Sequence, residues 1–134
     1  MLTPIPLLIV PLAVYNIFVF LTPGLDWHAI LATVPMMSGA SWTISIADVF
    51  LGFTLLILLV EVLKATRVSS RNIFDHILSV LLFAVAVGEF LLVAQAGTSV
   101  FALMGLVMLF DVIAGFWISV RVAQRDVALD SRLD

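Results

Sequence analysis

The chain lacks cysteine and contains few charged residues. Of its 134 residues only 11% are charged and 63% are hydrophobic, whereas about a quarter of a typical soluble domain is charged. The absence of cysteine excludes disulfide bonds, thiolate metal sites and cysteine nucleophiles. Six basic residues stand against nine acidic ones, for a net charge of −3, so no basic patch points to nucleic acid as a partner. The composition therefore indicates a membrane protein.

The hydrophobic residues are gathered into four runs long enough to be interpreted as transmembrane helices. The predicted spans cover residues 5–21, 44–63, 73–94 and 100–120. The connection at 22–43 carries Trp27 and Trp42, and tryptophan favours the headgroup layer, so we expect a short helix or loop in the membrane interface there. We therefore predict a single all-α domain over residues 1–134, a polytopic membrane protein whose four transmembrane helices form an antiparallel bundle.

The basic residues are confined to two regions. All six lie between the second and third predicted spans or after the fourth: Lys64, Arg67, Arg71, Arg121, Arg125 and Arg132. Cytoplasmic loops are enriched in Lys and Arg, so both regions are predicted to be cytoplasmic. Both termini, with the tail at 123–134, are then expected in the cytoplasm, and the 22–43 connection faces outward.

Three polar side chains stand inside different predicted spans without a basic neighbour. They are Asn16, Asp48 and Glu89. At 1.5 Å of rise per residue, each lies roughly 6 to 9 Å below the outer surface. Ionisable groups inside a membrane are costly and usually functional, so we expect these three to form a polar cluster that handles a proton or cation. The alternative is that they only supply hydrogen bonds between helices.

Asp48 and Asp111 begin the same pattern, Asp-Val-x-x-Gly-Phe, which places Gly52 and Gly115 four residues after the acids. Residues four apart share one helix face, and glycine lets a neighbouring helix approach closely. Asp111, Gly115 and Gly52 are therefore predicted to face a packing neighbour or a partner. Asp111 lies roughly 16 Å from the outer surface, close to the midplane. The sequence leaves open whether the pattern is a duplication or a coincidence.

A mixed-charge group is predicted at the cytoplasmic ends of the second and third spans. Its members are Glu61, Lys64, Arg67, Asp75 and His76. We interpret it as an interfacial salt-bridge cluster that fixes helix ends, because exposed pairs carry little energy. His28 and His76 are predicted on opposite sides of the membrane, so no metal or cofactor site is expected from them.

Four segments carry a resemblance to known proteins. They are Glu61–Arg67, Asp75–Ser79, Gly97–Phe101 and Asp111–Phe116. Together they resemble a group of small four-helix proteins of bacterial inner membranes whose function is not established, over about residues 42–126. The resemblance implies an inner-membrane location and brings no catalytic residues with it.

The small size and the lack of a soluble domain favour a non-catalytic role. We expect an integral membrane subunit, or an assembly or accessory protein, of a larger membrane complex. The alternative is a small proton- or cation-coupled transporter or channel that uses the intramembrane acids, as a homo-oligomer. An enzyme is not expected, because no nucleophile–base pair, metal set or phosphate loop is recognisable. The expected partners are the lipid bilayer and other membrane protein subunits or further copies of the chain.

Overall fold

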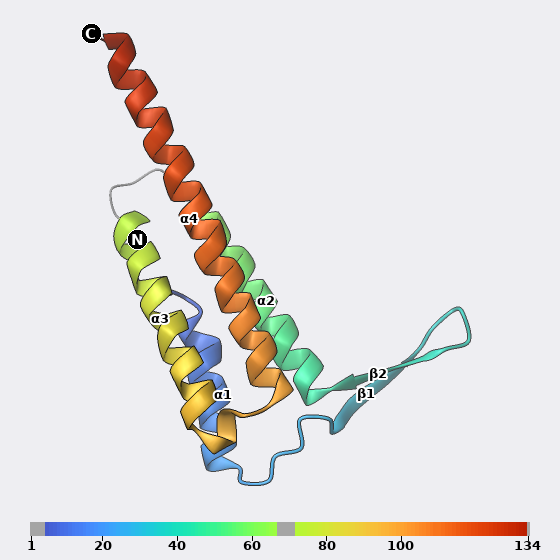
Figure 1. Cartoon of the computed structure of the whole chain (residues 1–134). Coiled ribbons are helices and arrows are strands. Elements are labelled where there is room, and N and C mark those ends of the chain that lie inside the picture. Colours follow the sequence, from blue (N-terminus) through green and yellow to red (C-terminus); the bar gives the residue numbers. More distant parts are fainter. Residues whose placement is uncertain (1–4, 67–71, 134) are drawn as a thin grey trace.

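The structure, a computed structural model, describes residues 5–66 and 72–133. It is mostly helical, at 74%, with four helices in those ranges. The elements in chain order are α1 (Ile9–Leu21), β1 (Ile30–Pro35), β2 (Ser41–Ser45), α2 (Ile46–Ala65), α3 (Asn72–Leu92), the 3-10 turn η1 (Ala94–Ala96) and α4 (Ser99–Leu133). Both α2 and α3 pack along α4, and α1 lies beside them in the half of the bundle nearest η1 (Figure 1).

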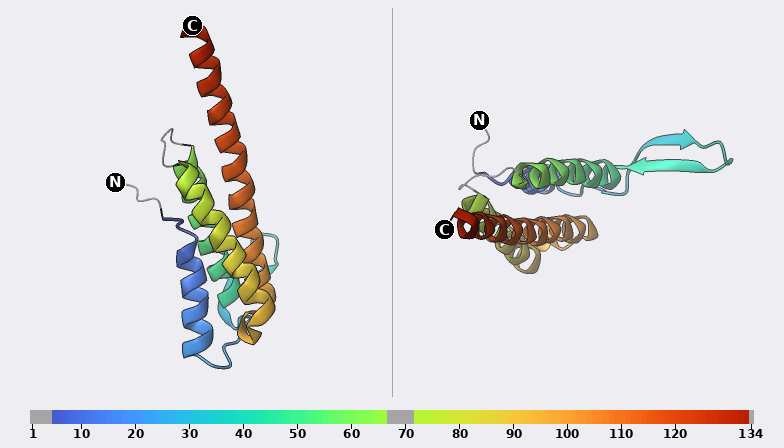
Figure 2. Two further views of the ribbon diagram at one scale, coloured as in Figure 1. Left: turned by 60° about the vertical axis from the view of Figure 1, so that its left-hand side comes forward. Right: turned by 90° about the horizontal axis from the view of Figure 1, so that it is seen from above.

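Three of these helices are long and apolar enough to cross a membrane. Mean hydropathy is 2.4 in α2, 1.9 in α3 and 2.2 in the apolar part of α4. Crossing the hydrocarbon core takes about 20 helical residues, and α1 has 13. The segment predicted as a first span at 5–21 therefore contains an apolar helix shorter than a typical span. At the other end, α4 continues as a helix to Leu133, well past the other helices (Figure 2).

The expectation of a short helix or loop at 22–43 was wrong from Ile30 onward. Residues 30–45 form an antiparallel hairpin of β1 and β2. Threonine and β-branched residues such as Val34 and Ile44 favour extended backbone, and Gly39 adopts a φ of 90° in the turn between the strands. Because this φ lies in the left-handed region, glycine suits the position. The fold is thus helical with one β-hairpin among the described residues.

The start of α2 follows from a capping box. The Asp48 backbone N–H donates to Ser45 Oγ (3.3 Å), and the Ser45 backbone N–H donates to Asp48 Oδ2 (2.9 Å). Two donors that have no partner within the helix are thereby satisfied. Because Ser45 is also the last residue of β2, the hairpin joins α2 without a linker.

An aromatic cluster holds α1 against the rest of the bundle. Tyr15 of α1 is fully buried, with its ring stacked on Trp27 (centroids 5.1 Å apart) and edge-on to Phe101 of α4 (4.9 Å). The Tyr15 hydroxyl donates to the Gln95 carbonyl oxygen (2.9 Å) and lies 2.7 Å from Thr98 Oγ1. The hydroxyl therefore ties α1 to the turn between α3 and α4.

Replacing Tyr15 with Phe removes this tie and keeps the ring. We expect the free energy of unfolding to fall by about 0.5–1.5 kcal/mol, the usual net value of a hydrogen bond. Denaturant titration in detergent micelles, followed by circular dichroism, measures the change. Phe20→Leu on the same helix is the control, since Phe20 is 52% exposed. Equal stabilities for Tyr15→Phe and the wild type would contradict the assignment.

Candidate functional site

The last turns of α2 carry a buried acid and a buried base. Glu61 and Lys64 are only 3% and 8% exposed, and Lys64 Nζ lies 3.3 Å from Glu61 Oε2. Both also bind the backbone ahead of α1. Lys64 Nζ donates to the Ile5 carbonyl oxygen (2.8 Å), and the Leu7 N–H donates to Glu61 Oε2 (3.0 Å). Pro6 favours an extended conformation at the residue before it, which leaves that carbonyl free to accept this bond.

The first turns of α3 add an acid, a histidine and a serine to this pair. Asp75 Oδ2 lies 3.8 Å from Lys64 Nζ, and Ser79, one turn further, is buried. Among the described residues, Asp75 Oδ1 and His76 Nδ1 are buried atoms without a hydrogen-bond partner. An unsatisfied buried polar atom costs about 1–3 kcal/mol. These two atoms are therefore places where a water molecule or a proton would be stabilised.

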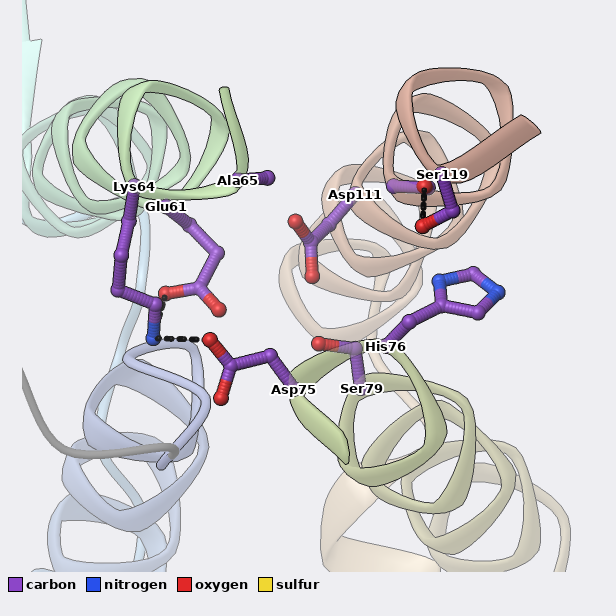
Figure 3. Close-up of a pocket in the computed structure, with 9 residues that line it drawn as sticks. Glu61, Lys64, Ala65, Asp75, His76, Ser79, Asp111 and Ser119 are labelled. Carbon is purple, nitrogen blue, oxygen red and sulfur yellow. Dashed lines mark hydrogen bonds and ion pairs between the residues drawn. The ribbon is translucent and has the colours of Figure 1, made fainter. Parts of the chain in front are cut away.

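The middle of α4 completes the site with Asp111, Gly115 and Ser119, spaced four residues apart on one helix face. Asp111 is 5% exposed, and the Ser79 hydroxyl lies beside its carboxyl group (Figure 3). A Cβ atom built on Gly115 would lie 2.9 Å from His76 Nδ1. Glycine at this position is what lets the imidazole of α3 lie against α4.

These side chains surround a small cavity where α2, α3 and α4 meet. Its volume is about 20 Å³, and a water molecule needs roughly 10–15 Å³. There is room for a single water. The carboxyl groups of Glu61, Asp75 and Asp111 point toward one another in the space between the helices (Figure 3).

We call Glu61, Lys64, Asp75, His76 and Asp111 the buried ionic cluster. Its three carboxyl groups share the cavity with one ammonium group, and the imidazole of His76 lies on the α4 side of the same cavity (Figure 3). With all carboxyls ionised and the imidazole neutral, two negative charges are uncompensated. Uncompensated charge in an apolar bundle is costly. The cluster therefore favours the uptake of positive charge.

Two of the three residues predicted to form an outer polar cluster make local hydrogen bonds. Asn16 Nδ2 donates to the Leu12 carbonyl oxygen of its own helix (3.0 Å). Asp48 is exposed and accepts from the Ser45 backbone and hydroxyl (both 2.9 Å). The third, Glu89, is half-buried. Within residues 5–66 and 72–133, no hydrogen bond or ion pair joins the three to one another. The acids that share a cavity are instead Glu61, Asp75 and Asp111, toward the opposite end of α2.

The two copies of the Asp-Val-x-x-Gly-Phe pattern have different surroundings. Gly115 packs against His76, as the packing argument requires, and Asp111 beside it is buried. Gly52 is exposed, and no described atom would lie within 4 Å of a Cβ built on it. A partner at Gly52 stays a prediction.

The buried ionic cluster contains four of the five residues predicted as a mixed-charge group at the ends of the second and third spans: Glu61, Lys64, Asp75 and His76. Arg67, its fifth predicted member, lies outside the described residues. Two features differ from the prediction. Glu61 and Lys64 are buried rather than exposed, and Asp111 lies with them, although the sequence analysis placed it on a separate packing face near the midplane.

Sequence reasoning did not single out Ser79 as a site residue, although counting from helix ends would have found it. Asp111 follows Ser99 by twelve residues and Ser79 precedes Leu92 by thirteen, so they lie roughly 18 and 20 Å from the same end of the bundle at 1.5 Å per residue. Ser119 follows from the four-residue spacing after Gly115, and its hydroxyl donates to the Gly115 carbonyl oxygen (2.7 Å).

Comparison with protein-family models, with curated proteins and with solved structures found no match to this chain. The site must therefore be interpreted from its own geometry.

Gly115→Ala should distort the cluster, because the new methyl group would lie within 2.9 Å of His76 Nδ1. We expect a loss of about 1–3 kcal/mol in the free energy of unfolding, the usual effect of overpacking. Gly52→Ala is the matched control. Nothing lies near its Cβ, and alanine is favoured over glycine in a helix by about 1 kcal/mol.

Unfolding titrations of both variants in micelles test this expectation. Adding His76→Ala to Gly115→Ala should recover most of the lost stability. If Gly115→Ala is as stable as Gly52→Ala, the close approach of His76 to α4 is refuted.

Proposed function

We propose that the protein is a small integral membrane protein that takes up and releases a proton at the buried ionic cluster. One observation carries the proposal. Three carboxyl groups and one lysine share a cavity the size of a water molecule, with Asp75 Oδ1 and His76 Nδ1 unpartnered beside it. Ionisable residues inside membrane segments typically mark proton or ion pathways.

The chemistry of the site favours a proton over another cation. Lys64 already places a fixed positive charge between Glu61 and Asp75, where it would repel an incoming metal ion. The cavity of about 20 Å³ suits one water molecule. Such a water could accept a proton from one group and donate to the next. His76 also lines this cavity, and its buried Nδ1 has no partner among the described residues, so it can bind the same water.

The position of the cluster supports exchange with one side of the membrane. Glu61 and Lys64 lie in the last turns of α2, and Asp75 lies in the first turn of α3. The six basic residues of the chain flank these helix ends and the end of α4, which under the positive-inside rule makes this side cytoplasmic. We propose a bacterial inner-membrane location with both termini in the cytoplasm. The Lys64 bond to the Ile5 carbonyl supports this, because it places that segment beside the end of α2.

Proton flux into liposomes tests the proposal. With a pH gradient and an enclosed pH-sensitive dye, Asp111→Asn should abolish the flux carried by the wild type, because the amide cannot be ionised. Glu89→Gln is the control, since Glu89 is a half-buried acid on α3, another helix long enough to span the membrane, and does not line the cavity. Flux that survives Asp111→Asn, or that is lost with Glu89→Gln, would rule out the cluster as the site.

A second candidate function is that of a non-catalytic subunit or accessory protein in a larger membrane complex. An apolar cavity of about 290 Å³ opens between α3 and α4. Small residues line part of it, among them Ala86, Ala102 and Gly105. Small residues allow the close approach of another transmembrane helix. This cavity supports docking of a partner helix or of a second copy.

Filling the cavity tests the second candidate. Gly105→Leu should reduce the recovery of a stoichiometric partner or a homo-oligomer in mild detergent. Ala123→Leu on the same helix serves as the control, because Ala123 is exposed and does not line the cavity. Unchanged association in Gly105→Leu would remove this cavity as the docking surface.

A further inference from the structure

The hairpin of β1 and β2 has one apolar face and one more polar face. Side chains of directly paired residues lie on the same side of a sheet, and successive residues alternate. The register therefore places two pairs on the apolar face: Ala32–Ile44 and Val34–Trp42. The opposite face carries the pairs Thr33–Thr43 and Pro35–Ser41. An amphipathic hairpin of this kind needs an apolar environment on one side only.

No part of the described chain supplies that environment. Trp42 is 54% exposed and Val34 is 38% exposed. The hairpin leaves the bundle sideways at the start of α2, and its tip lies away from all the helices (Figures 1 and 2). A two-stranded hairpin is at best marginally stable in water by itself. The apolar face is therefore the part of the hairpin that requires an external contact.

The composition and position of the hairpin favour lipid as that contact. No charged residue occurs from Ala29 to Ala47, although strand edges that face water are usually protected by charges. Ser45 ends β2 and also caps α2, so the hairpin starts at the level where a membrane-spanning helix begins. Tryptophan is enriched at this level of a bilayer.

We propose that the hairpin is a lipid-interface arm, whose apolar face (Ala32, Val34, Trp42 and Ile44) inserts between the headgroups and the upper acyl chains of the leaflet at the N-terminal end of α2. The polar face, with Thr33 and Thr43, remains in contact with water and headgroups. The arm widens the footprint of a small bundle in the membrane and restricts its tilt. This inference does not depend on the proton-exchange proposal, because the two sites share no residue.

Fluorescence quenching in phosphatidylcholine vesicles tests the arm. The chain has three tryptophans, so Trp27→Phe with Trp117→Phe leaves Trp42 as the sole emitter. The matched control adds Trp42→Phe and Thr43→Trp, which moves the reporter to the opposite face. Trp42 should be quenched by lipids brominated near the headgroup end of their acyl chains. Its acrylamide quenching constant should be several-fold smaller than that of the reporter at position 43.

Equal acrylamide quenching at the two positions, without quenching by brominated lipid, would overturn the proposal and leave this face to a partner protein. A second pair of variants keeps the test independent of the tryptophan substitutions. The chain has no cysteine, so Val34→Cys and Thr33→Cys each provide a single labelling site. A nitroxide at position 34 should be more accessible to oxygen than to a water-soluble nickel complex, and the label at position 33 should show the reverse. The same accessibility at both positions also overturns it.

Discussion

The burial of one ammonium group organises the end of the bundle that carries the candidate site. Lys64 Nζ contacts Glu61, Asp75 and the Ile5 carbonyl oxygen, which belong to α2, α3 and the segment ahead of α1. A buried charge is tolerated only where partners compensate it. Because the partners come from three parts of the chain, this requirement fixes how those parts meet. The site also contains more acidic groups than one lysine can neutralise, because Glu61, Asp75 and Asp111 all line the cavity.

Polar anchors at the two ends of the bundle have different chemistry. At the end near η1, the Tyr15 hydroxyl forms neutral hydrogen bonds and its ring lies in an aromatic cluster. At the other end, the anchors are ionisable and include unpartnered atoms of Asp75 and His76. The neutral hydrogen bonds of Tyr15 stabilise the fold but offer no ionisable group for proton exchange. The buried ionic cluster can both stabilise the fold and exchange a proton with a water in its cavity, so we place the proposed activity at the cluster.

The three proposed sites suit a small membrane protein. The hairpin would contact lipid at one side of the membrane, and the buried ionic cluster would exchange a proton at the other. The apolar cavity between α3 and α4 would receive a second helix. The ionic cluster and the apolar cavity share no lining residue, although both involve α3 and α4, so variants such as Asp111→Asn and Gly105→Leu should affect one property each.

The sequence by itself determined the class of the protein and most of its helices. Long apolar runs can only be accommodated as helices in a membrane, because backbone groups must be satisfied internally, and this placed α2, α3 and the apolar part of α4. It also identified Glu61, Lys64, Asp75 and His76 as one group, because they flank a single connection. Only the tertiary structure decided that Asp111 joins them, and in its described residues no hydrogen bond or ion pair links Asn16, Asp48 and Glu89. Depth along a helix follows from residue counts, whereas the direction in which a side chain faces depends on how the helices are rotated against one another. Polar side chains such as Asn16 and Asp48 can also satisfy themselves on their own backbone, and the sequence does not reveal when they do.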